Sequence, residues 1–323
     1  MDSFSDKKSD LGLRSLLLHC ILLCLTFLTT TLAGVQWLNK DPAELAYFSS
    51  GYTYAILIML VLCTHEMGHY VAARLHKVDA TLPYFIPFPS FWGLVPFGTL
   101  GAVIRLKAAV PSRKAMFDIG SAGPIAGFIV SVFILIVGFR TLPPVEYLYS
   151  IHPEYARLAK IPTEGLTFGN TFFYWVISGL APQGSFVPPM NEIYHYPFLC
   201  VGWFGLLVTA MNLIPIGQLD GGHIVYSMFG VHYHRIAQAA LVGLVIIGSL
   251  GFLPLLGIQF AYGWPGWLMW ALVLILFMRG ATVRRSPIDD ESPLDVNRLI
   301  VGWFCIVIFL GSFSLAPFTL EFR

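Results

Sequence analysis

The residues best suited to chemistry form the pattern His-Glu-Met-Gly-His over residues 65–69, inside an apolar segment. If this segment is helical, His65 and His69 lie one turn apart on one face, where both imidazoles can bind a single zinc ion. Glu66 can then reach a water molecule on that ion and act as a general base, because zinc lowers the pKa of bound water to about 7. The pattern therefore predicts zinc-dependent hydrolysis.

The specificity of this pattern depends on its surroundings, because the five-residue pattern H-E-x-x-H often occurs by chance in water-soluble chains. Here two imidazoles and a carboxylate lie in an apolar segment. Burying such polar side chains in a membrane helix is costly, so their presence usually marks a functional site. The alternative is a polar cluster that pairs with other helices and has no catalytic role.

A catalytic zinc ion needs a third protein ligand and an open fourth position. Asp220 is the candidate, in the stretch Asn-Leu-Ile-Pro-Ile-Gly-Gln-Leu-Asp-Gly-Gly over residues 212–222. Pro215 and the glycines should interrupt the helix, so an unwound stretch can bring Asp220 to the metal. An aspartate before two glycines is by itself more typical of a turn or a cap. However, Glu66 and Asp220 fall toward the same end of their predicted spans and can meet at a similar depth.

The elements that must hold these residues are membrane spans. The 323-residue chain is 56% hydrophobic and 11% charged with a mean hydropathy of +0.72, whereas a soluble domain carries about 25% charge. We expect an all-α polytopic membrane protein with about 6–7 transmembrane helices. The apolar stretches that predict these helices lie near residues 15–35, 53–75, 115–139, 198–222, 236–257, 263–279 and 298–318.

Charge indicates the partners and the orientation of the chain. The net charge is +1 with no long basic block, which argues against a nucleic-acid partner. Lysines and arginines, among them Lys7, Lys8, Arg284 and Arg285, gather on the face that holds the N-terminus. By the positive-inside rule we expect a cytoplasmic N-terminus, in a multi-pass protein of a bacterial inner (cell) membrane. The first span also has features of a signal peptide, and retention suits the charge bias equally well.

Four prolines interrupt the apolar segment of residues 81–103, so it cannot be one continuous helix. Irregular backbone is tolerated at membrane depth only where it is buried in protein or lines a watery cavity. The glycines and β-branched residues of 98–106 suggest a short hairpin, and we predict a small re-entrant β-loop. The alternative is a packed plug.

Three smaller features also predict structure. We expect a short interfacial helix near Thr171–Leu180, and we expect Asp118 to cap the N-terminus of the third span, where the helix dipole favours a negative charge. The glycines of residues 120–127 favour close helix packing, which is compatible with a position beside the metal. We expect His223 to be exposed or to lie just outside the ligand set.

Two motifs together, H-E-x-x-H at 65–69 and N-x-x-P-x-x-x-L-D-G at 212–221, resemble the site-2 protease family of intramembrane zinc metalloproteases. Residues 97–105 and 113–127 are also similar to the linker and the following span of that family, and the likeness covers roughly residues 55–225. The resemblance implies a Zn²⁺ cofactor bound by His65, His69 and Asp220, with Glu66 as base and Asn212 helping to hold the substrate. It also implies that the β-loop pairs with an unwound substrate strand.

The expected function is hydrolysis of peptide bonds within or beside the transmembrane segments of membrane-protein substrates, in the lipid bilayer. Residues 53–227 would form the catalytic membrane core, between an N-terminal part (1–52) and C-terminal spans (228–323). The main alternative is a transporter or channel that uses the buried carboxylates and histidines for proton or metal passage. Two others are an inactive relative that serves as a scaffold and a zinc protease family with a glutamate as third ligand, although the later spans contain no glutamate.

Overall fold

The computed structural model describes residues 12–89, 96–158, 160–258, 260, 262–280 and 292–321. Lys7, Lys8, Arg284 and Arg285, which support the predicted orientation, lie outside the described residues, as do residues 90–95 of the predicted β-loop.

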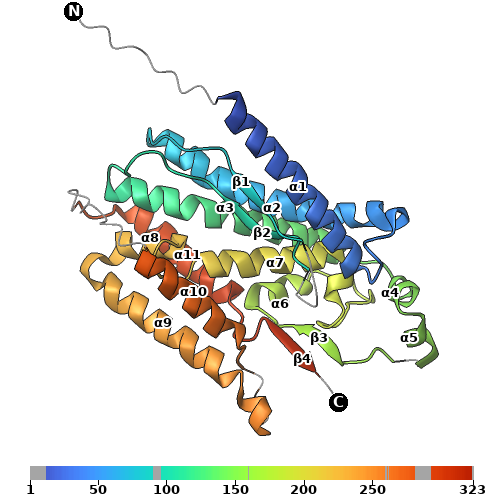
Figure 1. Ribbon diagram of the computed structural model, residues 1–323. Helices are drawn as coiled ribbons and strands as arrows, with labels where there is room; N and C mark the ends of the chain where they lie inside the picture. The colour runs from blue at the N-terminus through green and yellow to red at the C-terminus, as the bar shows by residue number, and fades with distance from the viewer. Residues whose placement is uncertain are drawn as a thin grey trace, which may run out of the picture.

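Most of the described chain is helical (Figure 1). The α-helices are α1 (Leu13–Trp37), α2 (Tyr52–Leu75), α3 (Arg113–Arg140), α4 (Glu146–Ile151), α5 (Pro153–Leu158), α6 (Phe172–Ser178), α7 (Pro197–Asn212), α8 (Asp220–Phe229), α9 (Tyr233–Leu250), α10 (Gly266–Gly280) and α11 (Val296–Ser312). Short 3-10 helices are η1 (Leu45–Gly51), η2 (Ile193–His195), η3 (Gly230–His232) and η4 (Leu253–Leu256). The strands are β1 (Tyr84–Pro87), β2 (Thr99–Val103), β3 (Gly165–Phe168) and β4 (Phe318–Glu321).

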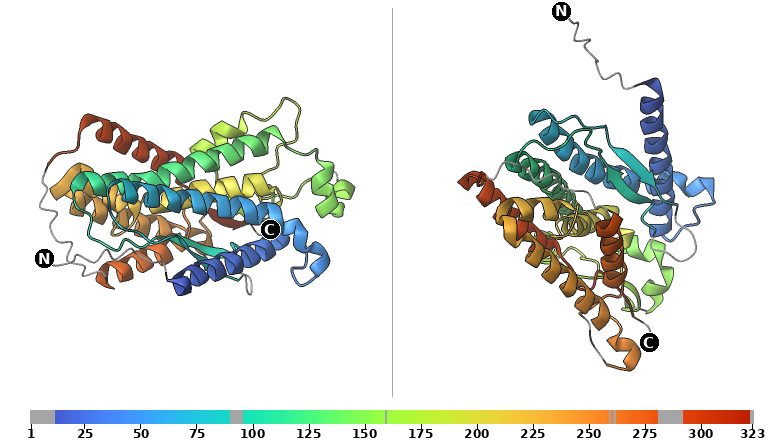
Figure 2. Two further views of the ribbon diagram at one scale, coloured as in Figure 1. Left: turned by 90° about the horizontal axis from the view of Figure 1, so that it is seen from above. Right: turned by 60° about the vertical axis from the view of Figure 1, so that its left-hand side comes forward.

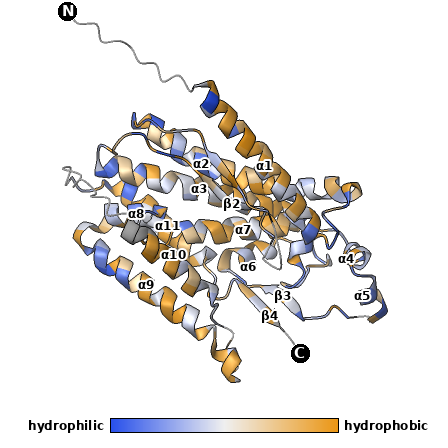
Figure 3. Ribbon diagram, viewed as in Figure 1, coloured by the Kyte–Doolittle hydropathy of each residue, from blue (hydrophilic) through white to orange (hydrophobic). Residues whose placement is uncertain are grey.

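Four helical stretches of the described residues are long and apolar enough to cross a membrane: Leu13–Trp37, Leu45–Leu75, Arg113–Arg140 and Asp220–Leu256. The chain is therefore an integral membrane protein, but the predicted count of six or seven spans is not confirmed. The predicted span at 198–222 ends early, because α7 stops at Asn212. Its 16 residues extend about 24 Å, less than the roughly 30 Å of a hydrocarbon core. Apolar residues nevertheless make up most of the long helices (Figure 3).

Helix α3 lies at the centre of the bundle, where it contacts α2, α7 and α8. Glycines allow this close packing: a Cβ on Gly68 would stand 2.6 Å from the Ala122 carbonyl oxygen, and one on Gly138 would stand 2.8 Å from the Phe198 Cβ. Glycine weakens a helix interior by roughly 1 kcal/mol relative to alanine, a cost that close contact between helices can offset.

The small sheet predicted within residues 81–103 is present as the antiparallel pair β1 and β2, in which Tyr84 pairs with Val103 and Phe85 with Ala102. The stretch 98–106, which suggested a short hairpin by itself, contains only β2. The sheet lies beside α1, as Figures 1 and 2 show. Side chains anchor both ends of the hairpin: His19 Nδ1 is 3.1 Å from the Pro83 carbonyl oxygen, and Thr29 Oγ1 donates to the Gly98 carbonyl at 2.6 Å. The predicted small sheet is thus confirmed.

A second sheet was not predicted. Strand β3 pairs antiparallel with β4, with Phe168 opposite Phe318. The last predicted span, near 298–318, in fact ends at Ser312, and the chain then turns into β4. The short helix predicted near 171–180 is present as α6, with Thr171 Oγ1 accepting from the Tyr174 N–H.

Asp118 does not cap α3, so that expectation is wrong. The helix begins at Arg113, and the hydroxyl of Ser112 accepts from the Ala115 N–H. Asp118 lies five residues further on, where its Oδ2 is 2.8 Å from His76 Nε2 and 2.6 Å from a guanidinium nitrogen of Arg298. The carboxylate therefore joins α3 to α11 and to the end of α2.

Replacing Asp118 with Ala should lower the free energy of unfolding by about 1–3 kcal/mol, because the charged hydrogen bonds from Arg298 would be lost at a site that is 27% exposed. Thermal unfolding in detergent measures the change. The matched control is Asp79→Ala, since the pair of Asp79 and Arg74 is more than half exposed and should change stability by less than about 0.5 kcal/mol. Equal effects of the two variants would contradict this role for Asp118.

Candidate metal centre

The two histidines of the H-E-x-x-H pattern lie on one face of α2, as predicted. His65 and His69 are 6% and 7% exposed, and their Nε2 atoms are 3.1 Å apart. Glycines of α3 leave room for both rings. A Cβ on Gly127 would stand 3.2 Å from His65 Nδ1, and one on Gly123 would overlap the His69 ring. The glycines predicted to allow close packing therefore pack against the two imidazoles.

The chain between α7 and α8 is unwound, as the proline and glycines of 212–222 predicted. Gly217 has a φ of 61°, in the left-handed region that favours glycine, and its N–H donates to the Tyr233 hydroxyl at 2.9 Å. A Cβ on Gly222 would stand 2.5 Å from the Gly217 carbonyl oxygen. A Cβ on Gly221 would overlap the Leu213 carbonyl oxygen, so the start of α8, which begins at Asp220, packs against the end of α7.

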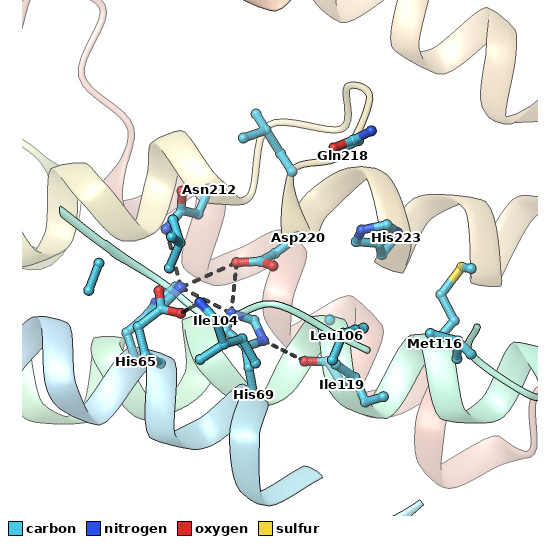
Figure 4. A pocket seen from close by; sticks show the side chains of 16 residues that line it. His65, His69, Ile104, Leu106, Met116, Ile119, Asn212, Gln218, Asp220 and His223 are labelled. Atoms are coloured by element: carbon cyan, nitrogen blue, oxygen red, sulfur yellow. Dashed lines mark hydrogen bonds and ion pairs between the residues drawn. The ribbon is translucent and has the colours of Figure 1, made fainter. Parts of the chain in front are cut away.

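This break brings Asp220 to the two histidines (Figure 4). Asp220 Oδ2 is 3.4 Å from His65 Nε2 and 3.3 Å from His69 Nε2. Three ligands of a tetrahedral zinc ion, each about 2 Å from the metal, lie roughly 3.3 Å from one another. Two imidazole nitrogens and one carboxylate oxygen also form a donor set that suits zinc. The residues present therefore fit a zinc ion with one open position.

Neighbouring groups orient these donors. His69 Nδ1 lies 2.7 Å from the Ile119 carbonyl oxygen, which can only accept a hydrogen bond. The proton of His69 therefore belongs on Nδ1, and the Nε2 lone pair faces the centre. Asn212 ends α7 beside the site, with Nδ2 3.3 Å from His65 Nε2.

Glu66 is 8% exposed, and its Oε2 accepts a hydrogen bond from the Ile104 N–H at 2.8 Å. This bond ties the carboxylate to the chain just after β2. A cavity of about 310 Å³ opens beside the centre, and β2, α3 and the start of α8 contribute to its walls. His223 also lines this cavity. It is not in the group of three donors, in line with the prediction that it lies outside the ligand set.

Replacing Gly123 with Ala should displace His69 and lower the zinc content of the purified protein, because the new methyl group would occupy the place of the ring. Gly243→Ala on α9 is the matched control, since no atom lies within 4 Å of its added Cβ. The control should retain zinc and become slightly more stable, by less than about 1 kcal/mol. Full zinc occupancy in Gly123→Ala would contradict the packing argument.

The sequence placed His65, Glu66, His69, Asp220 and Asn212 in one site, and the structure brings all five together. It did not identify the backbone groups that hold them. These are the N–H of Ile104 and the carbonyl of Ile119, and no side-chain pattern reveals a backbone partner.

An apolar helical bundle with H-E-x-x-H in one helix and an aspartate at a helix break defines the class of site-2 proteases, which are intramembrane zinc metalloproteases. The model of peptidase family M50 matches residues 53–255, and the chain belongs to this family.

The chain is similar to curated relatives from plants. It is 31% identical over 270 residues to the probable zinc metalloprotease EGY1, chloroplastic, of Oryza sativa subsp. japonica, a match that covers 82% of this chain and 41% of that protein. It is 30% identical to the protein of the same name from Arabidopsis thaliana, over 78% of this chain and 41% of the relative. It is 28% identical to the probable zinc metalloprotease EGY2, chloroplastic, of Oryza sativa subsp. indica, over 92% of this chain and 49% of that relative. The chain thus spans less than half the length of these relatives.

Proposed function

We propose that this protein is a zinc metalloendopeptidase that hydrolyses peptide bonds within or beside the transmembrane segments of membrane proteins. The observation that carries the proposal is the convergence of His65, His69 and Asp220 around one point, with Glu66 in the same cavity. Family membership supports the same activity. A transporter or channel finds no support, since the relatives are named zinc metalloproteases.

Each residue then has a role. His65, His69 and Asp220 hold the zinc ion, which supplies Lewis acidity toward the scissile carbonyl and toward water. Glu66 is the general base: its Oε2 is held by the Ile104 N–H, and Oε1 is the oxygen that takes a proton from water and passes it to the leaving amine. The Asn212 side-chain amide, at the rim of the same centre, helps to hold the substrate.

Strand β2 provides a place for the substrate backbone. A helical substrate hides its carbonyls in hydrogen bonds, so it must unwind before one of them can react. Strand β1 occupies one edge of β2, while Ala102 and Val103 of β2, followed by Ile104, line the cavity beside the metal centre. An unwound substrate segment can pair with the other edge of β2. The new backbone hydrogen bonds replace those that the segment loses when it unwinds.

The partners that follow are a membrane-protein substrate with a transmembrane segment and the lipid bilayer. We place the protein in a bacterial cell membrane with its N-terminus in the cytoplasm, on the charge distribution of the sequence, although the plant relatives are named chloroplastic. Residues 53–227 form the catalytic membrane core, between an N-terminal part and C-terminal spans.

A comparison of membrane proteomes tests the activity directly. Cells that carry the active protein should contain membrane-protein fragments that end inside a predicted span, and these fragments should be missing from cells with Glu66→Gln. Identical fragments in both cell lines would overturn the proposal. A transport function would instead change ion content without creating new chain ends.

A further inference from the structure

A second group of metal-binding side chains lies near the start of α7, at the opposite end of that helix from Asn212. It consists of His152, Glu192 and His195, from the junction of α4 with α5 and from the segment around η2. Helix α7 is about 24 Å long, so this group is separate from the candidate metal centre. We refer to it as the outer cluster.

The donor atoms of the outer cluster are of the same kinds as those of the candidate metal centre. His152 Nε2 and His195 Nε2 are 2.9 Å apart, and His195 Nε2 is 3.5 Å from Glu192 Oε2. At the metal centre, the two Nε2 atoms are 3.1 Å apart and the carboxylate oxygen is 3.3 and 3.4 Å from them. In both places, two imidazole nitrogens and one carboxylate oxygen lie close together, and the three donors of each group are within 4.8 Å of one another.

The partners of the two rings leave the lone pair of each ring on Nε2. His195 Nδ1 lies 2.6 Å from the Trp37 carbonyl oxygen, so Nδ1 carries the proton and Nε2 is left with a lone pair. His152 Nδ1 lies 3.0 Å from Glu154 Oε1, which favours the same tautomer. Two lone pairs that face each other at 2.9 Å repel unless a cation or a proton lies between them.

Glu192 distinguishes a cation from a shared proton. The residue is 2% exposed, and its Oε1 accepts hydrogen bonds from the Tyr155 hydroxyl at 3.0 Å and from Asn191 Nδ2 at 3.1 Å. Its Oε2 is buried and accepts no hydrogen bond from any described residue, although it points toward His195. A buried carboxylate oxygen without a donor is costly. A proton between the two rings leaves Oε2 unsatisfied, whereas a metal ion satisfies all three donors.

We propose that the outer cluster is a second binding site for a divalent cation of the zinc class, with His152, Glu192 and His195 as its protein ligands. The fourth position would hold a water molecule, since His152 is 15% exposed. The bound ion would fasten the α4–α5 segment to η2 and, through the carbonyl of Trp37, to the end of α1. This site does not depend on the proposed protease activity.

Zinc content of the full-length protein, purified in detergent and equilibrated with zinc alone, tests the site. The wild-type chain should bind about two zinc ions, and His65→Ala/His69→Ala should retain about one, because the outer cluster is intact. Two variants of the outer cluster, Glu192→Gln (which keeps the size of the side chain) and His152→Ala, should each bind about one zinc ion as well. In these variants the ion is at the metal centre. Combining Glu192→Gln with His65→Ala/His69→Ala should remove nearly all zinc.

His232→Ala/His234→Ala is the matched control, because both histidines are exposed and it should still bind about two zinc ions. Circular dichroism and gel filtration establish that each variant is folded. If the wild-type chain binds a single ion, and folded His65→Ala/His69→Ala binds none, the outer cluster is a metal-free hydrogen-bond network and the proposal fails. Because the decisive measurement uses a chain without the catalytic ligands, its outcome is independent of the protease assay.

Discussion

Glu66→Gln is expected to retain zinc at the metal centre and to lose peptide-bond hydrolysis by at least about 100-fold, and up to about 10⁴-fold. Glutamine has nearly the same shape, and its side-chain oxygen can still accept from the Ile104 N–H, so the cavity should keep its form. What the amide lacks is a lone pair basic enough to take a proton from water. Because Glu66 is not in the group of three donors, its replacement should leave zinc binding intact.

The measurement pairs zinc content with cleavage of a substrate identified by the proteome comparison. Glu44→Gln is the matched control, since this exposed glutamate precedes η1, outside the residues that line the cavity. A Glu66→Gln protein that cleaves at the normal rate would show that another group is the base. A variant that lost both zinc and activity would show instead that Glu66 supports the metal.

The parts of this protein that the sequence predicts well are those set by a strong local pattern. The helix spacing of His65 and His69 and the helix-breaking residues around Pro215 each have a direct physical consequence, and the structure shows both. The small sheet was predictable for the same reason, because repeated prolines exclude a helix and β-branched residues favour strands, although its first strand, β1, lies before the stretch 98–106 that suggested a hairpin.

Other features depend on contacts between distant segments. Asp118 reads as a cap because it lies near the start of an apolar run, yet Ser112 caps the helix and Asp118 binds Arg298, 180 residues away. The pairing of β3 with β4 joins residues that are far apart in the chain, and hydropathy alone extended the last span past Ser312 to the first residue of β4. The outer cluster was missed because its histidines are separated by 43 residues and belong to no motif.

The role of Asp220 leads to the second large expected effect. Asp220→Asn should weaken zinc binding at the metal centre by more than about 100-fold, since the loss of a partner that only orients a ligand already costs 10–100-fold. Asparagine keeps the size of the side chain but replaces a charged carboxylate, 3.3–3.4 Å from both histidine nitrogens, with a neutral amide. Two imidazoles would then remain as the only strong donors, too few for the three protein ligands of a catalytic zinc site.

This variant is best measured in a Glu192→Gln background, in which the zinc content reports on the metal centre alone. The matched control is Asp79→Asn, an aspartate that is 64% exposed and pairs with Arg74 on the surface, and it should leave zinc binding unchanged. A folded Asp220→Asn protein with normal zinc affinity would remove Asp220 from the ligand set. The break between α7 and α8, which Gly217, Gly221 and Gly222 allow and which brings Asp220 within 3.4 Å of both histidines, would then need another role.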